Sequence, residues 1–267
     1  MRHTQDGFTL VEMIMVIVIT GIIGGMVAVF LKAPIDQYMD VARRADMTDI
    51  ADTALRRIGR DLRLALPNSV QVHISGSGAS TVYYLDFLST SGGGRYLRDE
   101  GGTTNDKLDF TSADTSFEVL GTPPTCAPND QLVVYNLGIA PADAYAGGNR
   151  TTCSSVAPPI VNIAAKNFPL ESPSARFQVV HEQVRYICDP VSHTLTRYSF
   201  AGNAIVAPAA VIPAGGALLA SNVSSCSFSY DAFVVAQRSG LVAMNLGITK
   251  DNETVTLYSA AHVSNEP

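Results

Sequence analysis

The most unusual chemical group in the sequence is a single carboxylate, Glu12, inside a long apolar run. The run extends from Phe8 to Leu31 (FTLVEMIMVIVITGIIGGMVAVFL), and Glu12 is its only charge. About 20 apolar helical residues cross a bilayer core, so this run is predicted to be a transmembrane helix. A charge at the bilayer centre costs about 3 kcal/mol, and such groups usually serve a function. Snorkelling to the interface is the alternative, since Glu12 is expected only about 6 Å along the helix from Phe8.

The residues just before Glu12 form a motif with it. The segment Gly7-Phe8-Thr9-Leu10-Val11-Glu12 directly follows six leader residues. This segment resembles the processing motif of type IV prepilins and type II secretion pseudopilins. The resemblance implies cleavage after Gly7 by a prepilin peptidase, N-methylation of Phe8, and attraction between Glu12 and the terminal amine of a neighbouring subunit during assembly. An ordinary secretory signal is disfavoured, because the apolar run is too long and no A-x-A pattern follows it.

Four cysteines are the second clear chemical signal. Cys126, Cys153, Cys188 and Cys226 allow three pairings. Joining nearest neighbours gives Cys126–Cys153, which would clip the loop 141–159, and Cys188–Cys226, which would tie two predicted strands. Each bond would contribute roughly 3–4 kcal/mol through loop-closure entropy. A metal site is disfavoured, because no C-x-x-C spacing occurs and no histidine lies close in sequence.

Motifs for catalysis are missing from the sequence. His181, His193 and His262 fall on predicted strands or turns, without a G-x-S-x-G or H-E-x-x-H pattern. We therefore expect no catalytic residue, no metal and no cofactor, and a chain that is a substrate of enzymes rather than an enzyme. Charged residues make up 16% of the chain and the net charge is -6, which disfavours a nucleic-acid-binding surface.

The elements that position these groups begin with one long helix. The predicted divisions are a leader at 1–7, a transmembrane helix at 8–31, an amphipathic continuation at 32–67 and a β-rich head at 68–267. Pro34 is expected to kink the helix, and Pro67-Asn68 to end it. One apolar stripe comprises Ile35, Tyr38, Ala42 and Ala45; a second comprises Ala51, Ala54, Leu55, Ile58, Leu62, Ala65 and Leu66.

Arginines and aspartates alternate along the same helix at 43–63. Pairs such as Asp52–Arg56 and Arg57–Asp61 have the i,i+4 spacing of intrahelical ion pairs. The main interpretation is a solvated helix face; a docking surface for other subunits is the alternative.

Alternating apolar residues follow Asn68 and predict an antiparallel sheet, so the fold class is α+β, with a type IV pilin-like layout in which the long helix packs on a large head. Runs of glycine, including Ser91-Gly92-Gly93-Gly94, are expected to be turns. The predicted strands are 70–74, 81–87, 107–110, 116–120, 131–136, 177–188, 194–200, 225–230, 240–246 and 254–262.

The orientation across the membrane is predicted from the motif. Arg2 and His3 precede the span, whereas Lys32, Arg43 and Arg44 follow it, and this count alone favours a cytoplasmic head. The processing motif requires a cytoplasmic leader, and the cysteines suit an oxidising compartment. We therefore expect a single-pass inner-membrane protein with a periplasmic head that enters a pilus after assembly.

Further stretches resemble minor subunits of MSHA-type type IV pili. They are 42–58, 60–69, 184–190 and 262–265. This resemblance implies a minor subunit that primes pilus assembly near the tip. Its partners would be other major and minor pilins, the prepilin peptidase/methyltransferase and the inner-membrane assembly platform. The alternatives are a J-type minor pseudopilin of type II secretion and a surface-binding adhesin.

Overall fold

The computed structural model describes residues 7–99, 101–235 and 239–267, and it divides the chain into two compact units. Helix α1 (Leu10–Leu62) begins in the first unit, which ends at Met47, and its last turns belong to the second, Thr48–Pro267. The predicted leader, with Arg2 and His3, lies outside the described residues except for Gly7. Helix α1 runs on through Pro34 as one continuous element.

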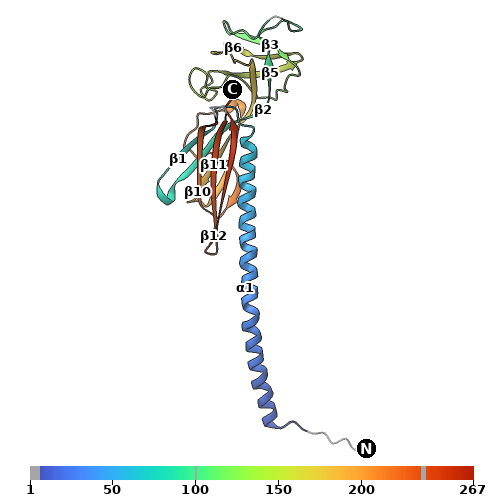
Figure 1. The fold of residues 1–267 in the computed structure, drawn as a ribbon, viewed down its shortest axis with the longest axis vertical. Helices are drawn as coiled ribbons and strands as arrows, with labels where there is room; N and C mark the ends of the chain where they lie inside the picture. The colour runs from blue at the N-terminus through green and yellow to red at the C-terminus, as the bar shows by residue number, and fades with distance from the viewer. Residues whose placement is uncertain (1–6, 100, 236–238) are drawn as a thin grey trace, which may run out of the picture. The chain divides into compact units, whose positions relative to one another are not determined.

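In the second unit, the described residues form two antiparallel sheets. Figure 1 shows their strands at the C-terminal end of α1. Within the described residues, the larger sheet has the order β1-β2-β3-β6-β5-β4-β7-β8-β9, and the smaller is a β10-β11-β12 meander. The strands are β1 (Gln71–Ser75), β2 (Val82–Tyr96), β3 (Asp114–Leu120), β4 (Gln131–Val134), β5 (Arg150–Ala157), β6 (Ile160–Lys166), β7 (Arg176–Asp189), β8 (Thr194–Ala201), β9 (Ala217–Ser221), β10 (Val223–Val235), β11 (Ser239–Lys250) and β12 (Glu253–Ser264). Two short 3-10 turns, η1 (Gly78–Ser80) and η2 (Gly202–Ala204), complete the head. The α+β fold class is therefore confirmed.

The larger sheet closes on itself at one end. Strands β2 and β7 pair along almost their whole length, and β3, β6, β5 and β4 connect them into a ring. Figure 1 shows β3, β5 and β6 together at the end of the head. An aromatic core fills the ring, with Tyr96, Phe117, Phe168 and Phe177 all fully buried.

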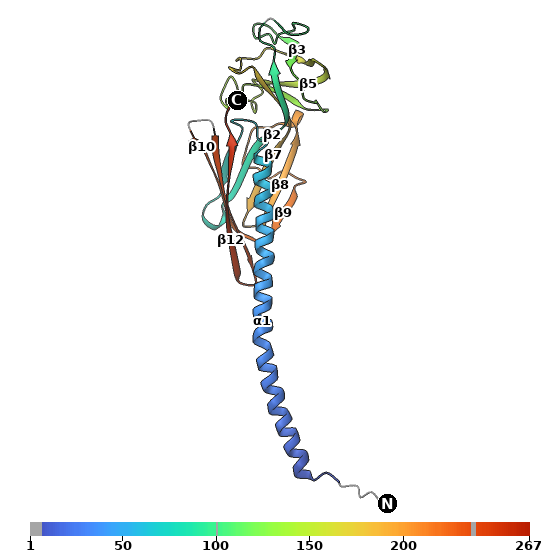
Figure 2. The same cartoon turned by 45° about the vertical axis from the view of Figure 1, so that its right-hand side comes forward.

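In the rest of the head, the last turns of α1 have the smaller sheet on one side and β8 and β9 on the other (Figure 2). The predicted apolar face of the helix is buried at Ala51, Ala54, Leu55, Ile58 and Leu62. Just after the helix, Ala65 forms a β-bridge with Ser89 of β2. The 3.6-residue periodicity of the sequence thus located the helix face that packs in the head.

The glycine run in 91–94 lies inside strand β2 and is not the predicted turn. A Cβ at Gly93 would lie 2.7 Å from the carbonyl oxygen of Phe177 on β7, and one at Gly94 would lie 3.0 Å from the Phe177 ring. The two strands also shift register near Thr90, where β2 bulges. Glycine is needed here for close strand packing beside a bulge.

Two further predictions about the head are wrong. Residues 107–110 form no strand: Leu108 is buried and Phe110 packs against the same core, while the Asp109 carboxylate accepts the Thr111 N–H at 2.7 Å in a turn. The segment 141–159 is not simply a loop, because it contains β5. Strands β5, β6 and β9 were not predicted.

Candidate processing and assembly site

The predicted processing residues lie immediately before the first turn of α1. Gly7, Phe8 and Thr9 precede the helix, which begins at Leu10. The Thr9 hydroxyl oxygen accepts the Glu12 backbone N–H at 3.3 Å, and the Thr9 carbonyl accepts the Met13 N–H at 3.2 Å. Thr9 is therefore the N-cap, satisfying an N–H group that the helix cannot pair itself.

Glu12 occupies the first turn of the helix. A carboxylate at this place interacts favourably with the positive end of the helix dipole. Its backbone is held by the Thr9 cap, so the side chain is presented from a defined helical position. Chemically, Glu12 offers an acceptor for a cation close to the residue that becomes the N-terminus if Gly7–Phe8 is cut.

The apolar side chains around this site are not covered by any other residue that the structure describes. Phe8 is 85% exposed, and the large apolar side chains from Leu10 to Leu31 are all at least half exposed. Helix α1 contains a stretch long and apolar enough to cross a membrane, and none of that stretch is buried. The stripe at Ile35 and Tyr38 is also exposed. Such a continuous apolar surface requires a lipid or protein environment.

The ion pairs on the charged face of α1 differ in their exposure to solvent. Asp52 and Arg56 pair at 2.6 Å on the exposed side, as predicted. Arg57 and Asp61 also pair, at 3.3 Å, but the Asp61 side chain is only 14% exposed. The solvated-face interpretation is therefore wrong for Asp61, which the head has covered.

Asp61 joins the helix to the larger sheet. Its carboxylate accepts hydrogen bonds from the Tyr186 hydroxyl at 2.6 Å and from the Arg197 guanidinium at 2.9 Å. Arg197 is itself paired with Glu182. Burial, together with the hydrogen bond to Asp61, raises the pKa of Tyr186, so its hydroxyl remains a donor. The sequence signal for this cluster was limited to the i,i+4 pair.

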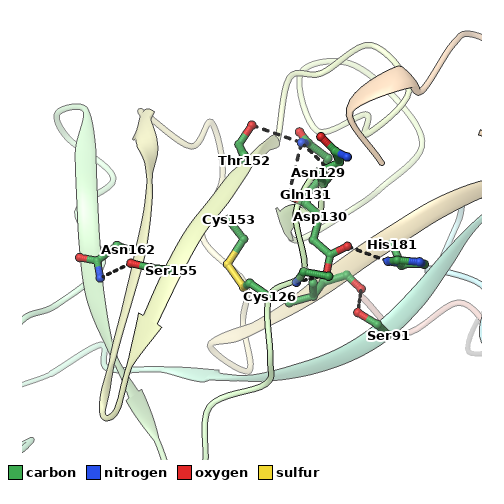
Figure 3. Close-up of a disulfide and its surroundings, with 12 residues drawn as sticks. Ser91, Cys126, Asn129, Asp130, Gln131, Thr152, Cys153, Ser155, Asn162 and His181 are labelled. Atoms are coloured by element: carbon green, nitrogen blue, oxygen red, sulfur yellow. Dashed lines mark hydrogen bonds and ion pairs between the residues drawn. A yellow bond between two sulfur atoms is a disulfide. The ribbon is translucent and has the colours of Figure 1, made fainter. Parts of the chain in front are cut away.

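The cysteines form the two nearest-neighbour bonds. Cys126–Cys153 links the segment before β4 to β5 (Figure 3). Cys188–Cys226 links the end of β7 in the larger sheet to β10 in the smaller sheet. The second bond therefore joins two sheets, a relationship that the sequence did not indicate.

Two of the three histidines singled out from the sequence, His181 and His193, form hydrogen bonds within the head. His181 Nδ1 lies 2.8 Å from the buried carboxylate of Asp130, which also accepts the Ala127 N–H (Figure 3). The nearby Ser91 hydroxyl donates to the Val179 carbonyl instead of to His181. His193 bonds the Val223 carbonyl. Within the described ranges, no three His, Cys, Asp or Glu side chains gather as a metal site.

Comparison with known proteins finds a match at the N-terminus. Residues 2–28 match the prokaryotic N-terminal methylation motif. No curated protein and no solved structure matches the chain. The match covers the motif and most of the apolar run, so the N-terminal segment is similar to that of a prepilin-type protein. The long helix and large antiparallel head agree with the α+β layout expected of one.

Proposed function

We propose that the chain is a prepilin that is cut between Gly7 and Phe8, methylated at Phe8, and assembled as a minor subunit of an MSHA-type type IV pilus. The observation that carries this proposal is the matched N-terminal motif at the start of an apolar helix that stays exposed among the described residues. Before assembly, a bilayer covers the apolar part of the helix. In the filament, the helices of neighbouring subunits replace the lipid.

Glu12 is proposed to act in the exchange between these two environments. Cleavage creates a positive amine at Phe8 on each subunit, and Glu12 is the only charge of the apolar run. Pairing the amine of one subunit with the Glu12 carboxylate of its neighbour neutralises both charges in apolar surroundings. The capped first turn supports this role, because it holds Glu12 in a fixed helical position.

The size of the head supports a minor rather than a repeating subunit. The second unit spans Thr48–Pro267 and contains two sheets. Such a bulky head is hard to accommodate at every helical position of a filament, so we place it at or near the tip, where it primes assembly. The stretches 42–58, 60–69, 184–190 and 262–265 resemble the MSHA biogenesis subunit MshO and support the assignment to that pilus type.

Two other functions share the same N-terminal features. A J-type pseudopilin would be processed identically but serve protein secretion. A tip adhesin would use the head to bind a surface. The neighbouring genes distinguish a pilus subunit from a pseudopilin, since they encode either pilus proteins or a secretion channel. Binding of the full chain to glycan arrays tests the adhesin alternative.

The processing step has a direct test. The full chain is expressed with and without a prepilin peptidase, and its N-terminal peptide is identified by mass spectrometry. We expect a peptide that begins with methylated Phe8 only when the peptidase is present, and an uncut chain for Gly7→Leu. Gly21→Ala is the matched control and should be processed normally. An uncut wild-type chain in the presence of an active peptidase would refute the proposal.

The minor position is tested separately by abundance. Immunoblots of sheared filaments, calibrated with purified chain, should show this subunit far below the main pilin. Equal abundance would exclude a tip position while leaving the processing result intact.

A further inference from the structure

A groove of about 630 Å³ runs between the last turns of α1 and the C-terminal half of β12. The helix contributes Leu55, Arg56, Gly59, Arg60 and Arg63, and the strand contributes residues 259–262. Figures 1 and 2 show the last turns of α1 beside the smaller sheet. The volume lies within the 300–1,000 Å³ range of ligand clefts.

One wall of this groove is the open edge of a sheet. β12 is the last strand of the smaller sheet and pairs with β11 from Glu253 to Ser264; in the described part of the chain, no strand pairs with its other edge. Edge strands are usually protected by Lys, Pro, a bulge, or a covering helix or loop. Here the groove lies between the strand edge and α1. β12 contains neither Lys nor Pro, and its pairing with β11 is regular throughout. Its inward-facing Val255, Leu257 and Ala261 are only partly buried.

The other wall is positively charged. Arg56, Arg60 and Arg63 have the spacing that places side chains on one helix face. Arg56 is paired with Asp52. Arg60 and Arg63 are exposed, and neither forms an ion pair with any carboxylate among the residues that the structure describes. Two uncompensated cations thus face a free β-edge in a chain whose net charge is -6.

We propose that this groove binds an extended segment of another subunit, which adds to β12 as a fourth strand and directs acidic side chains toward Arg60 and Arg63. Strand addition uses main-chain hydrogen bonds for affinity and alternate side chains for specificity. Arg60 and Arg63 are three helical residues apart, about 4.5 Å along the axis, and two strand residues advance about 6.7 Å. The long arginine side chains can span this difference. A nucleic acid fits less well, because the strand wall offers no Lys or Arg. This inference rests on the proposed pilus function and states the chemical character of one partner segment, an extended strand with acidic side chains.

Gly59 provides a selective way to block the groove. A Cβ at Gly59 would meet no atom within 4 Å, so a larger side chain enters the groove and not the core. Gly59→Leu should therefore fold and close the groove, whereas Gly59→Ala, its matched control, should leave the groove open. Arg60→Glu/Arg63→Glu reverses the charge, and Arg60→Lys/Arg63→Lys preserves it.

The test uses the purified full chain in detergent micelles, with an eight-residue peptide of alternating Glu and Val as the probe and a Lys-Val peptide as its control. Hydrogen exchange across residues 253–264 is measured by mass spectrometry. We expect the acidic peptide to slow exchange in this strand for wild type, Gly59→Ala and the lysine variant. Gly59→Leu should abolish this protection, and the glutamate variant should weaken binding about tenfold.

Three results would overturn the inference. The first is no protection of 253–264 by the acidic peptide at about 1 mM. The second is equal protection by both peptides or in Gly59→Leu. The third is arginine-dependent binding of a single-stranded oligonucleotide without protection of β12. The assay does not require assembly, so its outcome is independent of the cleavage and abundance tests.

Discussion

The hydroxyl of Tyr186 donates a hydrogen bond of 2.6 Å to the carboxylate of Asp61, which ties strand β7 to helix α1. Arg197 of β8 adds a 2.9 Å ion pair to the same carboxylate. We expect Asp61→Asn to destabilise the head by about 1–3 kcal/mol, because Arg197, only 16% exposed, loses a charged partner. Denaturant unfolding of the full chain in detergent, followed by tyrosine fluorescence, measures this free energy.

Asp52 supplies the control for Asp61. It forms a similar intrahelical pair with Arg56, but both side chains are well exposed. Asp52→Asn should therefore change the unfolding free energy by less than about 0.5 kcal/mol. Equal effects of the two substitutions would contradict a structural role for the covered cluster.

The bond between Cys188 and Cys226 is expected to hold the two sheets together. It closes a loop with a sequence separation of 38, and its replacement by Cys188→Ala/Cys226→Ala should cost about 4 kcal/mol. Hydrogen exchange should rise in β10–β12. The control is Cys126→Ala/Cys153→Ala, which removes a bond with a sequence separation of 27. It should lower the unfolding free energy by a similar amount, with faster exchange confined to β4 and β5. Exchange that rises in the same segments for both variants would contradict this assignment.

Glu118 of β3 should make the stability of the head depend on acidic pH. Hydrogen bonds from the Thr104 hydroxyl and from the Thr103, Thr104 and Asn105 N–H groups hold its pKa at about 2, against 4.5 ordinarily. A lowered carboxyl pKa stabilises the fold above pH 4.5, and this contribution is lost as the pH falls toward 2. Glu118→Gln should be less stable than wild type at neutral pH, with the difference shrinking over that window. A constant difference in unfolding free energy would refute this.

Replacing Gly93 and Gly59 by alanine should have opposite effects on the stability of the head. At Gly93 the added methyl would lie 2.7 Å from the Phe177 carbonyl oxygen, so β2 and β7 must separate and the head should lose about 1–3 kcal/mol. At Gly59 the methyl meets open space in a helix, where alanine is favoured by about 1 kcal/mol. Thermal unfolding should therefore show a lower midpoint for Gly93→Ala and a higher one for Gly59→Ala. A Gly93→Ala midpoint at or above wild type would show that the strands are not in such close contact.

Glu12→Gln should separate processing from assembly. The substitution removes the charge proposed to bind the neighbouring amine but keeps the helix, so the cut after Gly7 should be normal and the subunit should be lost from sheared filaments. Thr9→Val is the control: it removes the helix cap, at a cost of about 1 kcal/mol, but retains the carboxylate. Wild-type amounts of Glu12→Gln in filaments would exclude the assembly role. Immunoblots of membrane and filament fractions provide the measurement.

Features set by local periodicity were predictable from the sequence. The buried face at Ala54, Leu55 and Ile58 follows a 3.6-residue repeat, and the pattern of β12 follows a two-residue repeat. The N-terminal motif was predictable because its residues are contiguous. Each of these signals lies within one segment and needs no knowledge of its partner.

Features set by distant segments were not predictable. Asp52 and Asp61 look alike in sequence, and only Tyr186 and Arg197, more than a hundred residues away, distinguish them. Gly93 reads as a turn residue until Phe177 is placed against it. The closed ring of strands likewise depends on β2 and β7, whose register no local pattern specifies.

The positions of the cysteines also determine the order in which the head can be completed. Synthesis proceeds from the N-terminus, so Cys126 and Cys153 emerge before Cys188, and their bond can form while the later strands are still being made. Cys226 is the last of the four cysteines to emerge, before the rest of β10 and before β11 and β12. A chain interrupted before Cys226 therefore carries an unpaired Cys188 thiol, which marks it chemically as unfinished for any thiol-reactive quality-control factor.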